Sequence, residues 1–129
     1  MRLQVFRVMK IRAATVCWKG RKVLLVAKKT SKWSLPGGRR ERGETMRDAA
    51  VRELLEETRM RAKKTRLVCQ YANPKVAHHV FEITVKRGAL ASPGNEIKHC
   101  RWVDPKGVGK LRTGSGTSKI MQLLAKKAA

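Results

Sequence analysis

Six of the nine acidic residues in this sequence lie between Glu41 and Glu57, in a chain of 129 residues whose formal net charge is +22. Residues 46–57 are good helix formers and contain neither Pro nor Gly. Thr45 precedes them as a suitable N-cap, and Asp48 follows three residues later in a variant of the capping box. The segment therefore predicts a helix over residues 46–57, which is the strongest local constraint on the fold.

The predicted helix carries three carboxylates on one face. Successive residues of a helix turn by about 100°, so Glu53, Glu56 and Glu57 project within an arc of about 100°. Like charges at this spacing destabilise an isolated helix, which predicts a cation beside them. Two kinds of cation fit: a basic side chain in an ordinary salt bridge, or a hard divalent metal bound by oxygen ligands. Glu41 and Asp48 are interpreted as surface charges.

Strands are predicted on both sides of this helix, marked by β-branched and aromatic residues between Gly and Pro breaks. The expected elements are a hairpin of strands within 11–18 and 21–29, a short strand within 32–36, a loop over 37–44, strands within 65–72, 77–87 and 99–103, a loop over 106–116 and a helix over 117–129. This order predicts a mixed α+β layered fold. The length suits a single domain over residues 1–129.

The excess of basic residues limits the partners. Lys and Arg number 31 against nine Asp and Glu, so we expect an anionic partner, either a phosphorylated small molecule or nucleic acid. Cys17, Cys69 and Cys100 are widely spaced, which favours a reducing cytoplasmic location over a disulfide framework or a zinc site. No stretch approaches transmembrane length, so no membrane partner is predicted. Residues 1–16 are interpreted as leading into a strand, with an organelle transit peptide as the alternative.

From Gly38, the sequence GRRERGETMRDAAVRELLEETRM resembles the Nudix signature GX5EX7REUXEEXGU, in which U is a bulky apolar residue. The matching positions are Gly38, Glu44, Arg52, Glu53, Leu54, Glu56, Glu57 and Met60. Arg59 stands where the signature has Gly. A residue just past a helix commonly needs positive φ, which costs Arg about 1 kcal/mol relative to Gly. This departure affects the end of the helix and leaves the carboxylates in place.

The resemblance implies an α/β/α sandwich around a mixed β-sheet, and an enzyme that hydrolyses phosphoanhydride bonds. In such an enzyme Glu53, Glu56 and Glu57 would bind Mg²⁺ or Mn²⁺, and Glu53 is our candidate for the general base. The Gly37 carbonyl is a further candidate ligand. Glu96 is another, with a simple charge at the edge of a loop as the alternative interpretation.

Other residues are expected to support this site. Arg52 is counted with the catalytic glutamates, and the resemblance implies that it forms an ion pair with Glu44 that braces the loop against the helix. Gly38 belongs to the same structural motif. The candidates for contacts with substrate phosphates are Arg12, Arg39 and Arg40, with solvated surface charges as the alternative interpretation.

A weaker resemblance bears on the substrate. The stretches RAA, HHVFEITV and NEIKHCRWV look like Nudix members that act on diphosphoinositol polyphosphates or dinucleoside polyphosphates. We therefore predict a Mg²⁺-dependent pyrophosphohydrolase for one of these polyphosphorylated substrates. The alternatives are hydrolysis of a nucleoside triphosphate or an RNA 5′ end, a non-catalytic basic nucleic-acid-binding protein, and an inactive Nudix scaffold.

Histidine and tryptophan residues add two further expectations. His78 and His79 are adjacent in a predicted strand, so they point to opposite faces and cannot form a paired metal site. One of them is expected to touch phosphate or ribose, and the other to be structural. Trp33 and Trp102 are expected to pack in or near the core, with stacking on a base as the alternative.

Overall fold

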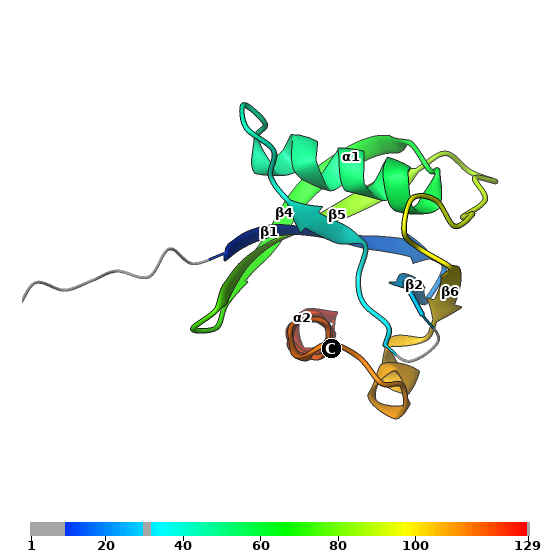
Figure 1. The fold of residues 1–129 in the computed structure, drawn as a ribbon. Coiled ribbons are helices and arrows are strands. Elements are labelled where there is room, and N and C mark those ends of the chain that lie inside the picture. The colour runs from blue at the N-terminus through cyan, green and yellow to red at the C-terminus, as the bar shows by residue number, and fades with distance from the viewer. Residues whose placement is uncertain (1–9, 30–31, 129) are drawn as a thin grey trace, which may run out of the picture.

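The computed structural model describes residues 10–29 and 32–128, and it places two helices on opposite sides of a mixed β-sheet (Figure 1). The elements are β1 (Lys10–Lys19), β2 (Lys22–Ala27), β3 (Gly37–Arg39), α1 (Met46–Thr58), β4 (Ala62–Ala72), β5 (Val76–Val85), β6 (His99–Val103), the 3₁₀ helix η1 (Pro105–Lys110) and α2 (Ser115–Ala128). The expected α+β class and the sandwich of helices around a mixed sheet are confirmed. No helix in the described part of the chain has the length and apolar character needed to cross a bilayer.

Strand β1 is the centre of the sheet, whose order is β4-β5-β1-β2-β6. It runs parallel to β5 and forms a tight antiparallel hairpin with β2. Away from that hairpin, β3 pairs with β1, so that Gly37 lies opposite Ala14 and Gly38 opposite Ala13. The two glycines are thereby held against the central strand.

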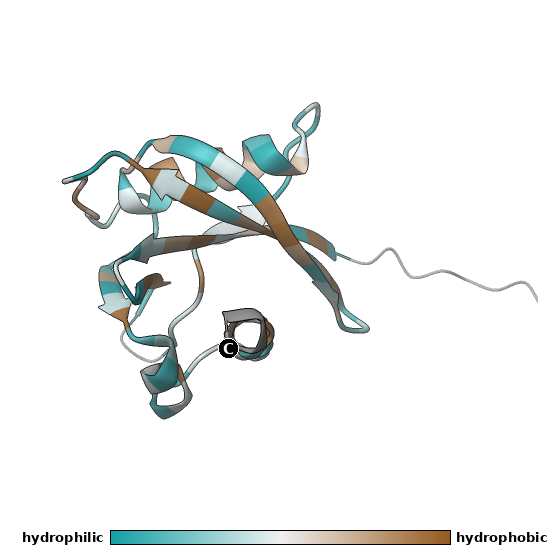
Figure 2. Ribbon diagram, turned by 180° about the vertical axis from the view of Figure 1, so that it is seen from behind, coloured by the Kyte–Doolittle hydropathy of each residue, from teal (hydrophilic) through white to brown (hydrophobic). Residues whose placement is uncertain are grey.

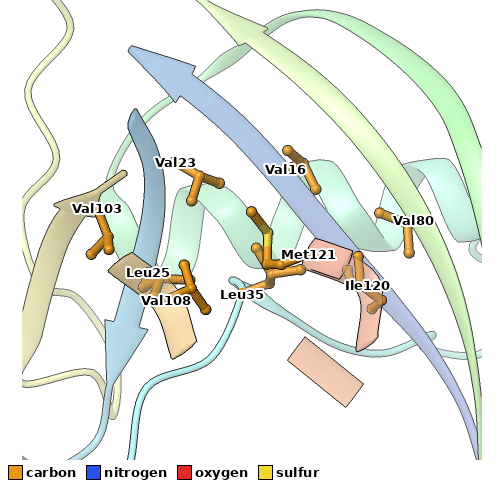
Figure 3. Packing of buried hydrophobic residues seen from close by; sticks show 10 residues of the cluster. Val16, Val23, Leu25, Leu35, Val80, Val103, Val108, Ile120 and Met121 are labelled. Carbon is orange, nitrogen blue, oxygen red and sulfur yellow. The ribbon is translucent and has the colours of Figure 1, made fainter. Parts of the chain in front are cut away.

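Both faces of the central strands are buried. On one face α1 covers a core made of Ala13, Cys17, Leu24, Ala49, Ala50, Leu54, Met60, Phe81 and Ile83. On the other face η1 and α2 cover a core made of Ala14, Val16, Val23, Leu25, Leu35, Val80, Val103, Val108, Ile120 and Met121 (Figure 3). Successive side chains of a strand point to opposite faces, so the apolar runs of β1 and β2 supply both cores. Polar and apolar bands instead follow each other along the outer strands (Figure 2).

Both ends of α1 follow from local chemistry. The Asp48 N–H donates to the Thr45 hydroxyl at 3.0 Å, which confirms the predicted N-cap. At the other end Arg59 has φ 61°, and its N–H donates to the Leu55 carbonyl at 2.8 Å. The positive φ expected at this position is therefore adopted by an arginine.

A loop closes the end of α1 by supplying donors to its last carbonyls. The Gly94 N–H donates to the Glu57 carbonyl at 3.0 Å, and the Ser92 N–H donates to the Thr58 carbonyl at 2.9 Å. A Cβ on Gly94 would collide with the Glu56 carbonyl. Glycine at this position lets the loop lie close enough to fix the helix end.

Several predicted boundaries are wrong. Residues 37–39 form β3 instead of a loop, because a glycine at position 37 can lie flush against β1 where a Cβ would collide with the Ala13 carbonyl. The predicted strand within 32–36 is reduced to isolated bridges at Trp33 and Ser34. The expected loop over 106–116 contains η1 and the start of α2. Residues 1–9, on which part of the N-terminal interpretation falls, lie outside the described residues.

Candidate functional site

Two carboxylates of α1 lie against the two glycines of β3. The Gly37 N–H donates to both oxygens of the Glu57 carboxylate, at 3.4 Å to Oε1 and 3.3 Å to Oε2. A Cβ on Gly38 would lie 2.6 Å from Cδ of Glu53 and 2.7 Å from its Oε1. The glycines thus allow Glu53 and Glu57 to reach the edge of the sheet together.

Burial makes these carboxylates hold protons more tightly. Glu57 is only 8% exposed, and burial raises its pKa to about 7 although the Gly37 N–H opposes the shift. Burial also raises the pKa of Glu53, opposed by the hydrogen bond from Arg52. The site therefore concentrates negative charge in a place that disfavours it, and a cation would relieve this strain.

Arg52 links the glutamates around it. Its Nε and Nη2 donate to the two carboxylate oxygens of Glu44 at 2.7 and 3.0 Å, so the predicted ion pair is present and bidentate. Nη1 donates to Glu53 at 2.8 Å and to Glu56 at 3.2 Å, and Nη2 also reaches the Arg39 carbonyl at 3.1 Å. The hydrogen bond from Arg52 lowers the pKa of Glu44. Arg52 therefore fixes the loop after β3 to α1.

The carboxylates face a pocket of about 850 Å³ that is bounded by the sheet and by α2. Arg12 of β1 lies in its wall, where Nη2 donates to the Gly37 carbonyl at 3.2 Å. The Leu35 N–H donates to the Thr117 hydroxyl at 3.1 Å and joins α2 to the segment that leads into β3. The pocket is thus built from segments that are far apart in the sequence.

The oxygen atoms beside Gly37 suit a divalent cation. The carboxylates of Glu53 and Glu57 and the Gly37 carbonyl are hard donors of the kind that Mg²⁺ binds, and their accumulated negative charge favours a cation. Within the described ranges, no three His, Cys, Asp or Glu side chains are already arranged as a metal cage. Arg52 instead holds Glu53, and Arg12 holds the Gly37 carbonyl. The residues fit the metal by chemistry, because Arg52 contacts only one oxygen of Glu53 and Arg12 makes only one hydrogen bond to the Gly37 carbonyl.

The remaining predicted residues divide between the pocket and the outside. Glu96 lines the pocket, but it is exposed and its Oε2 lies 3.0 Å from Nζ of Lys28. Glu56 is exposed on α1 and is held by Arg52. Arg39 and Arg40 are exposed side chains outside the pocket wall. The structure therefore groups Arg12, but neither of the other two candidate arginines, with Glu53 and Glu57.

His78 is one of the two adjacent histidines and lies in the pocket wall. Its ring stacks on Tyr71, with centroids 5.9 Å apart and an interplanar angle of 22°. Its Nδ1 is buried and has no hydrogen-bond partner among the described residues, and burial together with the charge of Arg12 lowers its pKa. A Cβ on Gly116 would lie 2.7 Å from Nε2 of this histidine, so α2 begins directly against the ring.

Sequence reasoning missed three lysines of the pocket wall, Lys28, Lys29 and Lys32. The pair Lys28 and Lys29 directly follows a buried strand, which was the available signal.

Trp33 and Trp102 are partly buried, as predicted. Trp33 packs against the core on the α2 side of the sheet, and Trp102 packs against the core on the α1 side.

Comparisons with known proteins agree with this geometry. The family model of the NUDIX domain matches residues 9–124. A proposed 8-oxo-dGTP diphosphatase of Bacillus subtilis is 38% identical over 86 residues, which are 64% of this chain and 58% of that protein. An ADP-ribose pyrophosphatase of Methanocaldococcus jannaschii is 34% identical over 103 residues, which are 72% of this chain and 60% of that protein. The matches thus span less than two thirds of either relative.

The fold is also found among solved structures. The crystal structure of a proposed nudix hydrolase family member from Chromobacterium violaceum has a TM-score of 0.83 and 25% sequence identity, and the match covers 95% of this chain and 80% of that one. The arrangement of the two helices around the mixed sheet therefore follows a known architecture.

Proposed function

The chain belongs to the Nudix family, and from this premise we propose that it is a Mg²⁺-dependent pyrophosphohydrolase that cleaves a phosphoanhydride bond in a nucleotide-type substrate. One observation carries the proposal: the buried carboxylate of Glu57 and the partly buried carboxylate of Glu53 lie against the glycines of β3 at the wall of a pocket that also holds Arg12. We further propose that residues 1–129 form a single Nudix domain. Mn²⁺ is the alternative cation to Mg²⁺.

The position of each residue in the site indicates its role in the proposed reaction. Glu57 is fixed by the Gly37 N–H and would hold the metal together with Glu53 and the Gly37 carbonyl. Glu53 is only partly buried, so it is placed to take a proton from water and is our candidate base. Once bound, the metal would neutralise phosphate charge and lower the pKa of a coordinated water. Arg12, in the wall of the same pocket, would contact the substrate phosphates.

Glu56, Arg52 and Glu44 are proposed to support this arrangement. Glu56 lies on the same helix face and is exposed, and it would be a further ligand of the metal. Arg52 would keep α1 and the loop in register through its bidentate pair with Glu44. Glu96 would become a further ligand only after separating from Lys28. Arg39 and Arg40 would contact only a substrate that extends beyond the pocket.

The choice of substrate rests on the names of the relatives. These proteins are described as acting on 8-oxo-dGTP and on ADP-ribose, which both carry a nucleoside diphosphate. The names give no support to a diphosphoinositol polyphosphate substrate. We therefore propose a nucleoside diphosphate linked to a further group, a class that includes nucleoside triphosphates and dinucleoside polyphosphates.

The test is a chromatographic measurement of substrate loss and of all phosphorylated products in the presence of Mg²⁺, because ADP-ribose and a dinucleoside polyphosphate split without releasing free phosphate or pyrophosphate. The panel contains 8-oxo-dGTP, the ordinary nucleoside triphosphates, ADP-ribose, a dinucleoside polyphosphate and a diphosphoinositol polyphosphate. Glu57→Gln should lose at least about 100-fold in kcat/KM, while Glu82→Gln, a surface carboxylate on β5, should not. Turnover of no substrate by a folded, metal-supplied protein would overturn the proposal in favour of a binding role.

A further inference from the structure

A row of basic side chains borders one side of the pocket and has no part in the proposed hydrolysis. Lys28, Lys29 and Lys32 line the pocket and are exposed. Of the acidic side chains that line the pocket, Glu96 is the exposed one, and it pairs with Lys28 at 3.0 Å. At physiological ionic strength charges act over about 8 Å, so neighbouring lysines at this edge repel one another.

The backbone joins these lysines to a second basic segment. The Trp33 N–H donates to the Arg112 carbonyl at 2.8 Å, and the Gly114 N–H donates to the Trp33 carbonyl at 3.3 Å. Cε of Lys32 lies 3.6 Å from the position that a Cβ on Gly114 would take. The exposed Arg112 is therefore held next to the lysines, although it lies far from them in the sequence.

Strand β6 extends the basic surface. Arg101 lies over the Trp33 ring, with Cζ 5.9 Å from the ring centroid, and His99 lies 6.4 Å from the same ring at a tilt of 52°. His99 and Arg101 alternate on β6, so their side chains share one face of the sheet. Both are exposed. A flat guanidinium supported by an indole is a surface on which a nucleobase stacks well.

We propose that this basic rim, made of Lys28, Lys29, Lys32, Trp33, His99, Arg101 and Arg112, binds single-stranded nucleic acid beside the pocket. Cations along the rim would attract the phosphates, and the Arg101–Trp33 pair offers a platform for a base. The proposal goes beyond hydrolysis of a free nucleotide. It rests on the proposed function in one respect only, which is that the end of the nucleic-acid strand would enter the pocket.

The composition of the rim argues against a lipid surface as the partner. Among the described residues, the large hydrophobic side chains that are exposed are Ile11, Trp18, Leu67, Leu90 and Leu123. None of them belongs to the rim, and its one large aromatic side chain, Trp33, is half-buried with Arg101 over its ring, so the rim offers no exposed large apolar side chain for insertion into a membrane. The formal net charge of +22 makes association with a long polyanion favourable.

The experiment measures fluorescence anisotropy of a labelled single-stranded oligonucleotide in EDTA, over a series of NaCl concentrations. EDTA prevents metal-dependent turnover, so the result is independent of whether the protein is a hydrolase. The rim variant carries Lys32→Glu and Arg101→Glu. The matched control carries Lys64→Glu on β4, the opposite edge strand, and Arg87→Glu after β5, which change the net charge by the same amount.

The rim variant should bind at least tenfold more weakly than the control, and the slope of log K against log salt should fall by at least about 0.7 for the loss of the phosphate contact of Lys32. An abasic oligomer should bind the unmodified protein at least about fivefold more weakly than the oligonucleotide. Equal losses in the rim variant and the control would show a general charge effect and overturn the proposal. Equal affinity for inorganic polyphosphate, or binding only to anionic vesicles, would also overturn it.

Discussion

The carboxyl group of Glu57 is disfavoured in its charged form in the metal-free protein. Its pKa is about 7 when folded and near the ordinary glutamate value when unfolded, so the folded state binds the extra proton. This contribution to stability is present at acid pH and is lost as the pH rises through about 7. Between about pH 5 and about pH 8, the Tm of the metal-free protein should fall relative to that of Glu57→Gln, by an amount corresponding to as much as about 3 kcal/mol.

Mg²⁺ should oppose this trend, because it binds the deprotonated carboxylate. Thermal unfolding with and without Mg²⁺ at each pH checks this point. The gain in Tm from Mg²⁺ should grow as the pH rises through about 7 and should be small in Glu57→Gln. A gain that is independent of pH would contradict the assignment of Glu57 as a ligand.

Gly38 sets the position of Glu53. A Cβ at residue 38 would fall 2.6–3.0 Å from all three atoms of the Glu53 carboxylate, so Gly38→Ala should push that group away from the sheet edge. A displacement of about 1 Å costs on the order of 100-fold in rate, and we expect such a loss in kcat with little change in Tm. Gly109→Ala is the matched control, because nothing lies within 4 Å of a Cβ there. Equal activity of the two variants would show that Glu53 is not held by this glycine.

At the scale of elements, α1 ends on an unfavourable residue. Arg59 has φ 61°, in the left-handed region that costs a non-glycine residue about 1 kcal/mol. Arg59→Gly should therefore raise the free energy of unfolding by about 1 kcal/mol, measured by urea denaturation at unchanged m-value. Arg61→Gly, at an exposed neighbouring position without positive φ, should be neutral or destabilising. Stabilisation by both variants would assign the effect to lost positive charge.

Elements with local signals could be predicted from the sequence. The start of α1 depends on Thr45, and the hairpin of β1 and β2 depends on one short turn, so both were found. Strand β3 was missed because two glycines carry no strand propensity. They form a strand only because they pair with β1, whose Ala13 carbonyl leaves no room for a side chain on Gly37. Such a requirement belongs to the partner strand and leaves no local pattern.

At the scale of the whole molecule, the net charge of +22 should weaken the fold when salt is low. The screening length falls from about 30 Å at 0.01 M to about 8 Å at 0.15 M ionic strength, so the Tm should rise over this range. The charge-reducing control variant Lys64→Glu with Arg87→Glu should show a smaller rise. Sucrose, which is uncharged, separates screening from a general solvent effect, and a Tm that ignores NaCl would contradict self-repulsion.

The site is predictable only where it is local. The glutamates share a face of one helix, and their spacing alone placed them together. The pocket wall instead joins Arg12 of β1, His78 of β5 and Thr117 of α2, which meet because β1 and β5 run parallel and α2 packs over them. The parallel register sets Arg12 opposite His78, a pairing between residues 66 positions apart that no local pattern records.

The burial of Cys17 offers an internal reporter for all of these variants. Cys17 has 0% exposure in the core under α1, so its sulfur atom is inaccessible in the native protein. Burial also raises the pKa of its thiol to about 11, which disfavours the reactive thiolate. Alkylation at this position therefore requires the core to open. The rate of Cys17 labelling, read by peptide mass spectrometry, would tell a variant that has lost chemistry from one that has lost its fold, without any added dye or tag.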